Sequence, residues 1–127
     1  MPSLADSTNA FMSTFNDGEF ERMIGLLSPE AVYIDPNGTE HSGVDEIGAS
    51  LKSMFDGSLG SVSFDVSSTL FDESDQRALV TWTMVMTAAD GSVSSVDGLD
   101  ILRFEAGRLV SKNAFCKAEA LAIRSAS

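Results

Sequence analysis

The sequence is short of positive charge and of histidine. Its 127 residues hold 8 Lys and Arg against 19 Asp and Glu, which gives a formal net charge of −11, and His41 is the only histidine. A negative chain repels phosphate backbones and anionic bilayers, so neither nucleic acid nor membrane is expected as a partner. A lone loop histidine gives little support to a catalytic metal site, and no cofactor is expected.

Cysteine and long apolar runs are scarce as well. Cys116 is the only cysteine, so an internal disulfide and a thiolate metal site are both excluded. No apolar stretch approaches the ~20 residues that cross a bilayer, and the start lacks the basic residues and apolar run of a secretory signal. Phosphate-binding glycine loops and nucleophile motifs are also missing. These absences predict a cytoplasmic protein without nucleotide chemistry.

What the chain does have is apolar content and periodicity. With 43% apolar residues, residues 1–127 are expected to form one domain with a real core. Apolar spacing predicts helices over residues 3–15, 20–27 and 44–55. The first and third helices are preceded by sequences that match capping boxes, namely Ser3 with Asp6 and Ser42 with Asp45.

The second half alternates with a period of two residues, which is typical of strands. A short strand from Ala31 to Asp35 is followed by four longer strands, over residues 62–70, 78–86, 96–104 and 109–116. Short turns between the long strands favour antiparallel hairpins. Helices followed by such a meander predict an α+β fold. For the tail after Lys117, a brief helix and a frayed end both stay open.

Two local stretches resemble the nuclear transport factor 2 and ketosteroid isomerase superfamily, which also contains SnoaL-like cyclases. Residues 16–43 include Asp35-Pro36-Asn37-Gly38 and a later Ser42-Gly43, similar to the isomerase pattern. The second stretch is Asp100-Ile-Leu-Arg103-Phe104 with the hairpin after it. The resemblance covers nearly the whole chain. It implies a cystatin-like, cone-shaped domain in which three N-terminal helices pack on a strongly curved, mostly antiparallel sheet.

The resemblance also implies an internal pocket for a small apolar ligand and a homodimer through the sheet. In the isomerases, the aspartate matching Asp35 moves the proton, and the one matching Asp100 stays protonated and donates to the substrate oxygen. Their second donor is a tyrosine on the first helix, and Phe11 stands at the aligned position. Loss of such a donor typically costs ~10²–10³ in rate. Tyr33 and Trp82 are candidate substitutes.

Each candidate has a plainer structural interpretation. Asp35 could simply begin the turn by bonding to its own downstream backbone. Asp100 interrupts an apolar strand on the same face as Leu102 and Phe104, so we expect it to face inward. The alternative is an outward register, in which Asp100 is solvated or pairs with Lys112.

The ligand-binding candidates are apolar or aromatic side chains, which are equally common in a plain core. Counting in the isomerase register would put one of them, Trp82, on the outer face of the sheet, and the sequence leaves its side open. The leading hypothesis is a cofactor-independent isomerase or cyclase for a small, steroid-like or polyketide-like carbonyl compound. The alternative is a non-catalytic ligand-binding or dimerisation module. The residues expected to bind the ligand are Phe11, Phe15, Tyr33, Phe55, Trp82 and Leu102.

Overall fold

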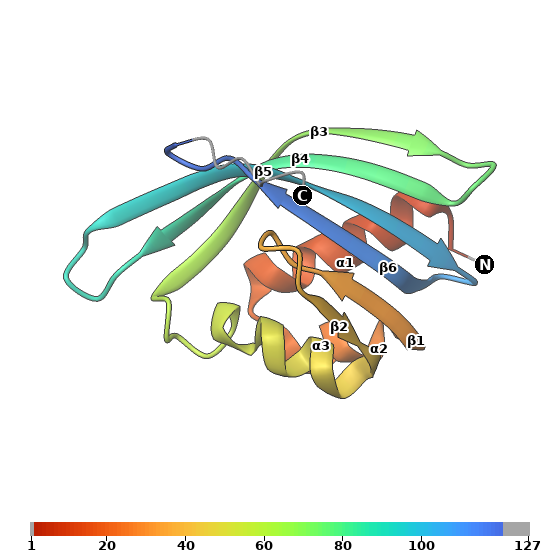
Figure 1. Cartoon of the computed structure of the whole chain (residues 1–127), viewed down its shortest axis with the longest axis horizontal. Coiled ribbons are helices and arrows are strands. Elements are labelled where there is room, and N and C mark those ends of the chain that lie inside the picture. The colour runs from red at the N-terminus through yellow and green to blue at the C-terminus, as the bar shows by residue number, and fades with distance from the viewer. Residues whose placement is uncertain (1, 121–127) are drawn as a thin grey trace, which may run out of the picture.

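The computed structural model describes residues 2–120 and shows helices packed against one curled sheet (Figure 1). The helical elements are α1 (Leu4–Asp17), α2 (Phe20–Gly25), α3 (Gly43–Leu51) and the single 3-10 turn η1 (Lys52–Met54). The strands are β1 (Leu27–Ile34), β2 (Glu40–Ser42), β3 (Ser61–Asp72), β4 (Arg77–Thr87), β5 (Val93–Glu105) and β6 (Arg108–Cys116). The predicted α+β class is confirmed.

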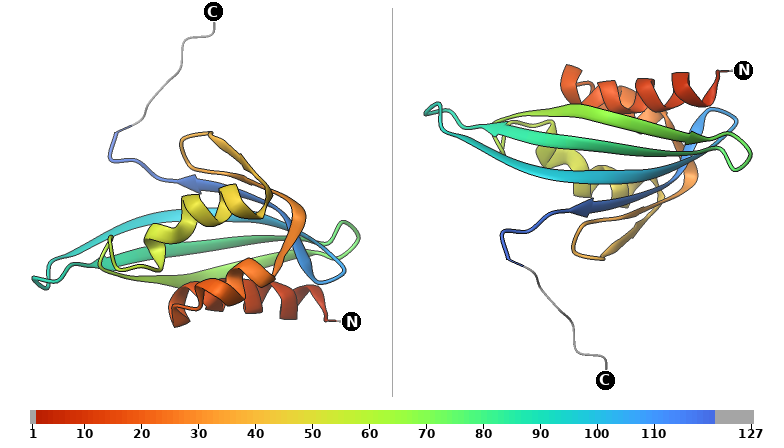
Figure 2. Two further views of the ribbon diagram at one scale, coloured as in Figure 1. Left: turned by 90° about the horizontal axis from the view of Figure 1, so that it is seen from below. Right: turned by 90° about the horizontal axis from the view of Figure 1, so that it is seen from above.

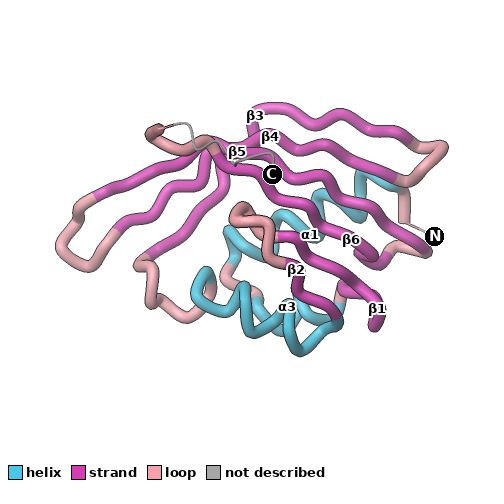
Figure 3. Tube along the Cα trace, in the orientation of Figure 1, coloured by secondary structure: helices cyan, strands magenta, loops and turns pink. Residues whose placement is uncertain are grey.

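The strands form one sheet in the order β2-β1-β6-β5-β4-β3. Neighbouring strands are antiparallel except β1 and β6, which run parallel. Figure 3 shows the long strands bending over the helices, and the two views of Figure 2 place the helices on one side of the sheet. We call the sheet face that packs on the helices the inner face and the opposite one the outer face.

The first helix is capped as its sequence predicts. The Ser3 hydroxyl accepts a hydrogen bond from the Asp6 N–H at 3.0 Å, and Gly18 ends the helix in the left-handed conformation at φ 67°. The capping box predicted before α3, Ser42 with Asp45, is wrong in its second residue. There, Glu46 Oε1 accepts from the Ser42 N–H at 3.0 Å, because the longer glutamate side chain reaches back across the first turn.

The region between α2 and α3 differs most from expectation. Strand β1 begins at Leu27, inside the predicted second helix, because Leu27 pairs with Leu109 of β6. Strand β2 was not predicted, since three polar residues carry no periodic signal. The third helix ends at Leu51 and tightens into η1. Residues 121–127 of the tail lie outside the described residues.

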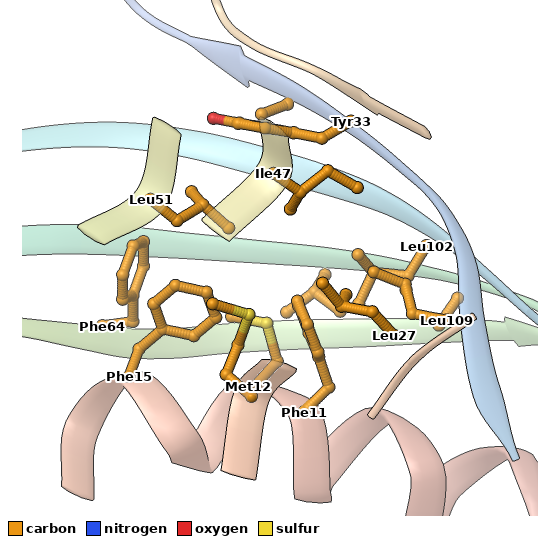
Figure 4. Packing of buried hydrophobic residues seen from close by; sticks show 14 of the residues in the cluster. Phe11, Met12, Phe15, Leu27, Tyr33, Ile47, Leu51, Phe64, Leu102 and Leu109 are labelled. Carbon is orange, nitrogen blue, oxygen red and sulfur yellow. The ribbon is translucent and has the colours of Figure 1, made fainter. Parts of the chain in front are cut away.

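The core lies between the helices and the inner face (Figure 4). On β4, the side chains of Ala78, Val80 and Trp82 are buried, so the register that would put Trp82 on the outer face is wrong. Its indole lies across Gly98 of β5. A Cβ added at Gly98 would fall 2.5 Å from Trp82 Cη2 and 2.4 Å from the Phe115 carbonyl oxygen. Only glycine lets the indole and the neighbouring strand approach this closely.

The outer face carries exposed apolar side chains, among them Leu70 and Phe115. The expected homodimer through this face stays a prediction. No helix within residues 2–120 is long and apolar enough to cross a membrane.

Candidate functional site

A buried ion pair lies on the inner face, in the middle of the sheet. Asp100 of β5 is 0% exposed, as its inward register predicts, and Lys112 of β6 is 5% exposed. Lys112 Nζ donates to Asp100 Oδ1 at 2.8 Å. Pairing with Lys112 was expected only for an outward Asp100, but the structure shows that both side chains face inward. Lys112 lies opposite Leu102 of the neighbouring strand β5, and its long side chain reaches diagonally to Asp100, two residues along that strand.

One oxygen of this pair is left open. Among the described residues, buried side-chain atoms without a hydrogen-bond partner are Asp100 Oδ2 and Trp82 Nε1. We refer to these two as the open atoms. A buried polar group without a hydrogen-bond partner lowers the free energy of unfolding by about 1–3 kcal/mol, and by more where the group is charged. The interior therefore contains one acceptor and one donor that need a partner.

Aromatic rings surround the ammonium group. Lys112 Nζ lies 5.4 Å from the Tyr33 ring centroid and 5.8 Å from that of Phe15, distances at which a ring face attracts a cation. Burial raises the pKa of the Tyr33 phenol far above its ordinary value, and the Asp100 and Asp35 carboxylates add to the shift. The Tyr33 hydroxyl therefore keeps its proton and can donate a hydrogen bond.

Asp35 follows β1 directly and organises the turn toward β2. Its Oδ1 accepts from the N–H groups of Asn37 at 2.9 Å and Thr39 at 3.0 Å, so the expected turn role is present. Its Oδ2 accepts from His41 Nε2 at 2.9 Å. In a neutral imidazole this leaves Nδ1 free to accept a proton. Asp35 and His41 thus form an oriented carboxylate and imidazole pair, which we call the dyad.

The dyad makes stability depend on pH. The His41 hydrogen bond, with those from Thr39 and Asn37, holds the pKa of Asp35 below its ordinary 3.8. The charged form therefore stabilises the fold above pH 3.8, and this contribution is lost as the pH falls through the lowered pKa. We expect Asp35→Asn to be less stable than the wild type at neutral pH and equally stable in strong acid. Urea unfolding over a pH series checks this, and a constant difference would contradict it.

Strand register brings the dyad next to the ion pair. His41 of β2 lies opposite Tyr33 of β1, and Tyr33 lies opposite Lys112 of β6. The His41 and Tyr33 rings stack with centroids 5.4 Å apart and an interplanar angle of 24°. Imidazole, phenol, ammonium and carboxylate therefore form a row across the inner face, which we call the polar row: His41, Tyr33, Lys112 and Asp100.

The other predicted site residues divide into two groups. Phe15 and Phe55 pack at 5.0 Å, and Phe15 and Trp82 both contact Phe64, so these rings lie together beside the polar row. Phe11 and Leu102 are 0% exposed and pack deeper in the core. Figure 4 shows the Tyr33 hydroxyl pointing away from Leu102, toward the side on which Leu51 and Phe64 lie. A ligand role for any of these residues stays a prediction.

Sequence reasoning missed two members of the polar row. The sequence predicts a loop at His41, because the three polar residues of β2 carry no strand signal. Lys112 was considered only as a surface partner, since a charged residue in an alternating strand is usually assigned to solvent. The available signal was the spacing of Lys112 two residues before the apolar Ala114, which puts both on the same face of a strand. Within residues 2–120 no group of three or more His, Cys, Asp or Glu residues is placed to hold a metal ion.

Solved structures with the same fold are numerous. A nuclear transport factor 2-like protein of unknown function from Exiguobacterium sp. 255-15 is 23% identical, with a TM-score of 0.72 over 87% of this chain and 98% of that one. A protein of unknown function with a cystatin-like fold from Methylobium petroleophilum PM1 is 20% identical, with a TM-score of 0.73 over 94% and 81%. A proposed SnoaL-like polyketide cyclase from Shewanella denitrificans OS-217 is 12% identical, with a TM-score of 0.77 over 92% of both chains.

These identities show a shared fold and leave the chemistry open. A search of the curated proteins found no match. The family model of the SnoaL-like domain matches residues 8–112, which span α1 to the lysine of the polar row. The chain is therefore a member of the SnoaL-like domain family, and its fold is that of the nuclear transport factor 2-like structure from Exiguobacterium.

Proposed function

We propose that the protein is an acid-base enzyme for a small apolar carbonyl compound, an isomerase or cyclase that works without a cofactor. The observation that carries the proposal is the dyad stacked on Tyr33. It puts a proton acceptor and a hydrogen-bond donor next to each other on the inner face. The polyketide-cyclase name of the Shewanella relative favours the same broad chemistry.

The proposed reaction begins with removal of a proton beside the carbonyl. His41 Nδ1 takes the proton from the carbon, and the C–H electron pair forms the enolate double bond while the carbonyl oxygen gains negative charge. The Tyr33 hydroxyl donates to that oxygen, which stabilises the charge as it develops. In an isomerase, His41 returns the proton to the γ carbon. In a cyclase, the enolate carbon attacks the carbon of a second carbonyl group, whose C=O π electrons move to its oxygen, and that oxygen takes the proton back from His41.

This assignment modifies the roles that the isomerase resemblance implies. One carboxylate oxygen of Asp35 accepts hydrogen bonds from the turn, and the other accepts one from His41. We therefore propose that Asp35 orients the base. Asp100 is joined to Lys112 in an ion pair, so we propose that it accepts hydrogen bonds inside the pocket. Tyr33 takes the place of the missing hydroxyl at Phe11.

The test is ultraviolet detection of a conjugated enone formed from a β,γ-unsaturated ketosteroid. We expect the wild type to form enone and Asp35→Asn to be slower, because an asparagine no longer fixes the imidazole. A flat wild-type trace with this ketone and with smaller β,γ-unsaturated cyclic ketones would reject the isomerase reaction.

A non-catalytic ligand-binding module is the second candidate. It is favoured by Phe11, a fully buried side chain without a hydroxyl group at the position of the isomerase tyrosine. In that case the same probes would bind without turnover.

A further inference from the structure

A depression of about 250 Å³ lies on the outer face of the sheet, where β4, β5, β6 and β1 run side by side. Along these strands its residues alternate with buried inner-face neighbours such as Ala78, Leu102 and Lys112. Alternation therefore turns the lining side chains away from the helices and from the polar row. The lining includes Arg77, Arg103, Ser111, Asn113, Ile34 and Ile101.

Two of the lining residues are arginines that face each other. Arg77 of β4 lies directly opposite Arg103 of β5. Like charges in this position repel and destabilise the strand pair, unless an anion lies close to both. The two guanidinium groups therefore form a centre of positive charge on a chain whose net charge is −11.

Asp75, in the turn between β3 and β4, meets this demand only in part. Its Oδ2 lies 2.7 Å from Arg77 Nη2, but its Oδ1 lies 3.9 Å from Arg103 Nε, which is too far for a hydrogen bond. Arg103 also donates from Nη2 to Glu105 at 3.1 Å. These contacts use some of the five N–H groups that each guanidinium carries. The other N–H groups are available to an acceptor in the depression.

The rest of the lining is apolar with two neutral polar groups. Ser111 of β6 lies opposite Arg103, and the next row on the same face consists of Ile101, Asn113 and Ile34. A charged row and an apolar row thus run side by side, with a hydroxyl and an amide between them as further donors. The volume is below the roughly 300–1,000 Å³ of sites for drug-sized ligands. An occupant must therefore be small, anionic at one end and apolar at the other.

We propose that this depression binds a small carboxylate with a short apolar body, held by Arg77 and Arg103 and resting on Ile101. A planar carboxylate matches the guanidinium fork, which can hold both oxygens at once. Without ligand, Asp75 is the anion that keeps the two arginines together, so it competes with the ligand. The site lies on the opposite face of the sheet from the dyad and is independent of the proposed function.

Two probes of the same shape test the proposal. 3-Methylbutanoate carries a charged carboxylate, and 3-methylbutanamide is its neutral counterpart. In protein labelled at the isoleucine methyl groups, we expect the carboxylate to shift the NMR signals of Ile34 and Ile101 in a saturable way. It should bind at least about tenfold more tightly than the amide. Ile47, which is 1% exposed in the core, provides a signal that should not move.

Three variants of similar size locate the effect. Arg77→Gln should weaken carboxylate binding by about tenfold, since it removes one of the two guanidinium groups. Asp75→Asn should have the opposite effect and tighten binding several-fold, because the competing charge is gone. Glu73→Gln is the control, since it removes a charge from the same turn, and within residues 2–120 that carboxylate is not paired with either arginine. Its affinity should stay within about twofold of the wild type.

Tighter binding in Asp75→Asn is a result that a merely structural role of the arginines would not produce. Equal affinities for the two probes, unmoved signals of the two lining isoleucines, or unchanged binding in Asp75→Asn would overturn the proposal. Analytical ultracentrifugation covers the remaining use of the same groups. If Arg77→Gln altered self-association of the chain and left probe binding unchanged, the two arginines would belong to a homodimer contact and the proposal would be rejected.

Discussion

Replacing Lys112 by methionine is expected to lower the free energy of unfolding by about 3–5 kcal/mol. Methionine keeps most of the lysine's length and removes the ammonium group. Asp100, which is 0% exposed, then loses the hydrogen bond to Oδ1 while Oδ2 remains open. A buried charge without a partner is among the few causes of such large losses. Urea denaturation, followed by circular dichroism, measures the change.

Two controls separate the ion pair from a general lysine effect. Lys52→Met changes an exposed lysine and should alter stability by no more than about 0.5 kcal/mol. The double variant Asp100→Asn with Lys112→Met removes both charges and should recover most of the loss. Two results would contradict a stabilising ion pair. One is a Lys112→Met variant as stable as the wild type, and the other is a double variant no more stable than Lys112→Met.

His41→Gln is expected to lower kcat by about 10²–10⁴ if the dyad supplies the base. Glutamine can still donate to Asp35 but has no basic nitrogen, so the turn should persist while proton transfer stops. The initial rate of enone formation by the wild type and the variant measures the effect.

The comparison with Asp35→Asn assigns the base. In the dyad, Asp35 orients His41, so its variant should lose less activity than His41→Gln. Glu40→Gln, an exposed neighbour of His41, should leave the rate unchanged. Full activity in His41→Gln with none in Asp35→Asn would instead make Asp35 the base on its own.

The fold could be predicted because several local signals agree. The Ser3 cap and the stop at Gly18 specify the first helix, and apolar alternation within each of the four later stretches specifies a strand. The short turns then leave only hairpins between the long strands. Where signals were weak, boundaries shifted. Leu27 fits a helical period but joins β1, since pairing with Leu109 buries its side chain.

The site was harder to predict, because it depends on contacts between residues distant in the sequence. Burial of Asp100 followed from its apolar neighbours on β5, whereas its pairing with Lys112, which is also buried, depends on how β5 and β6 align. His41 joins Tyr33 through the three-residue strand β2, which no periodicity reveals. Trp82 lies on the inner face because Gly98 leaves space for its indole. This contact joins two different strands, so the sequence alone does not reveal it.

The most direct test of the account is solvent-deuterium incorporation into a small cyclic β,γ-unsaturated ketone, followed by NMR with wild-type protein and His41→Gln. This measures removal of the proton beside the carbonyl, whatever the natural product of the reaction. The account predicts rapid exchange at that carbon with the wild type and exchange at the uncatalysed rate with His41→Gln. Equal exchange rates for the two proteins would contradict it.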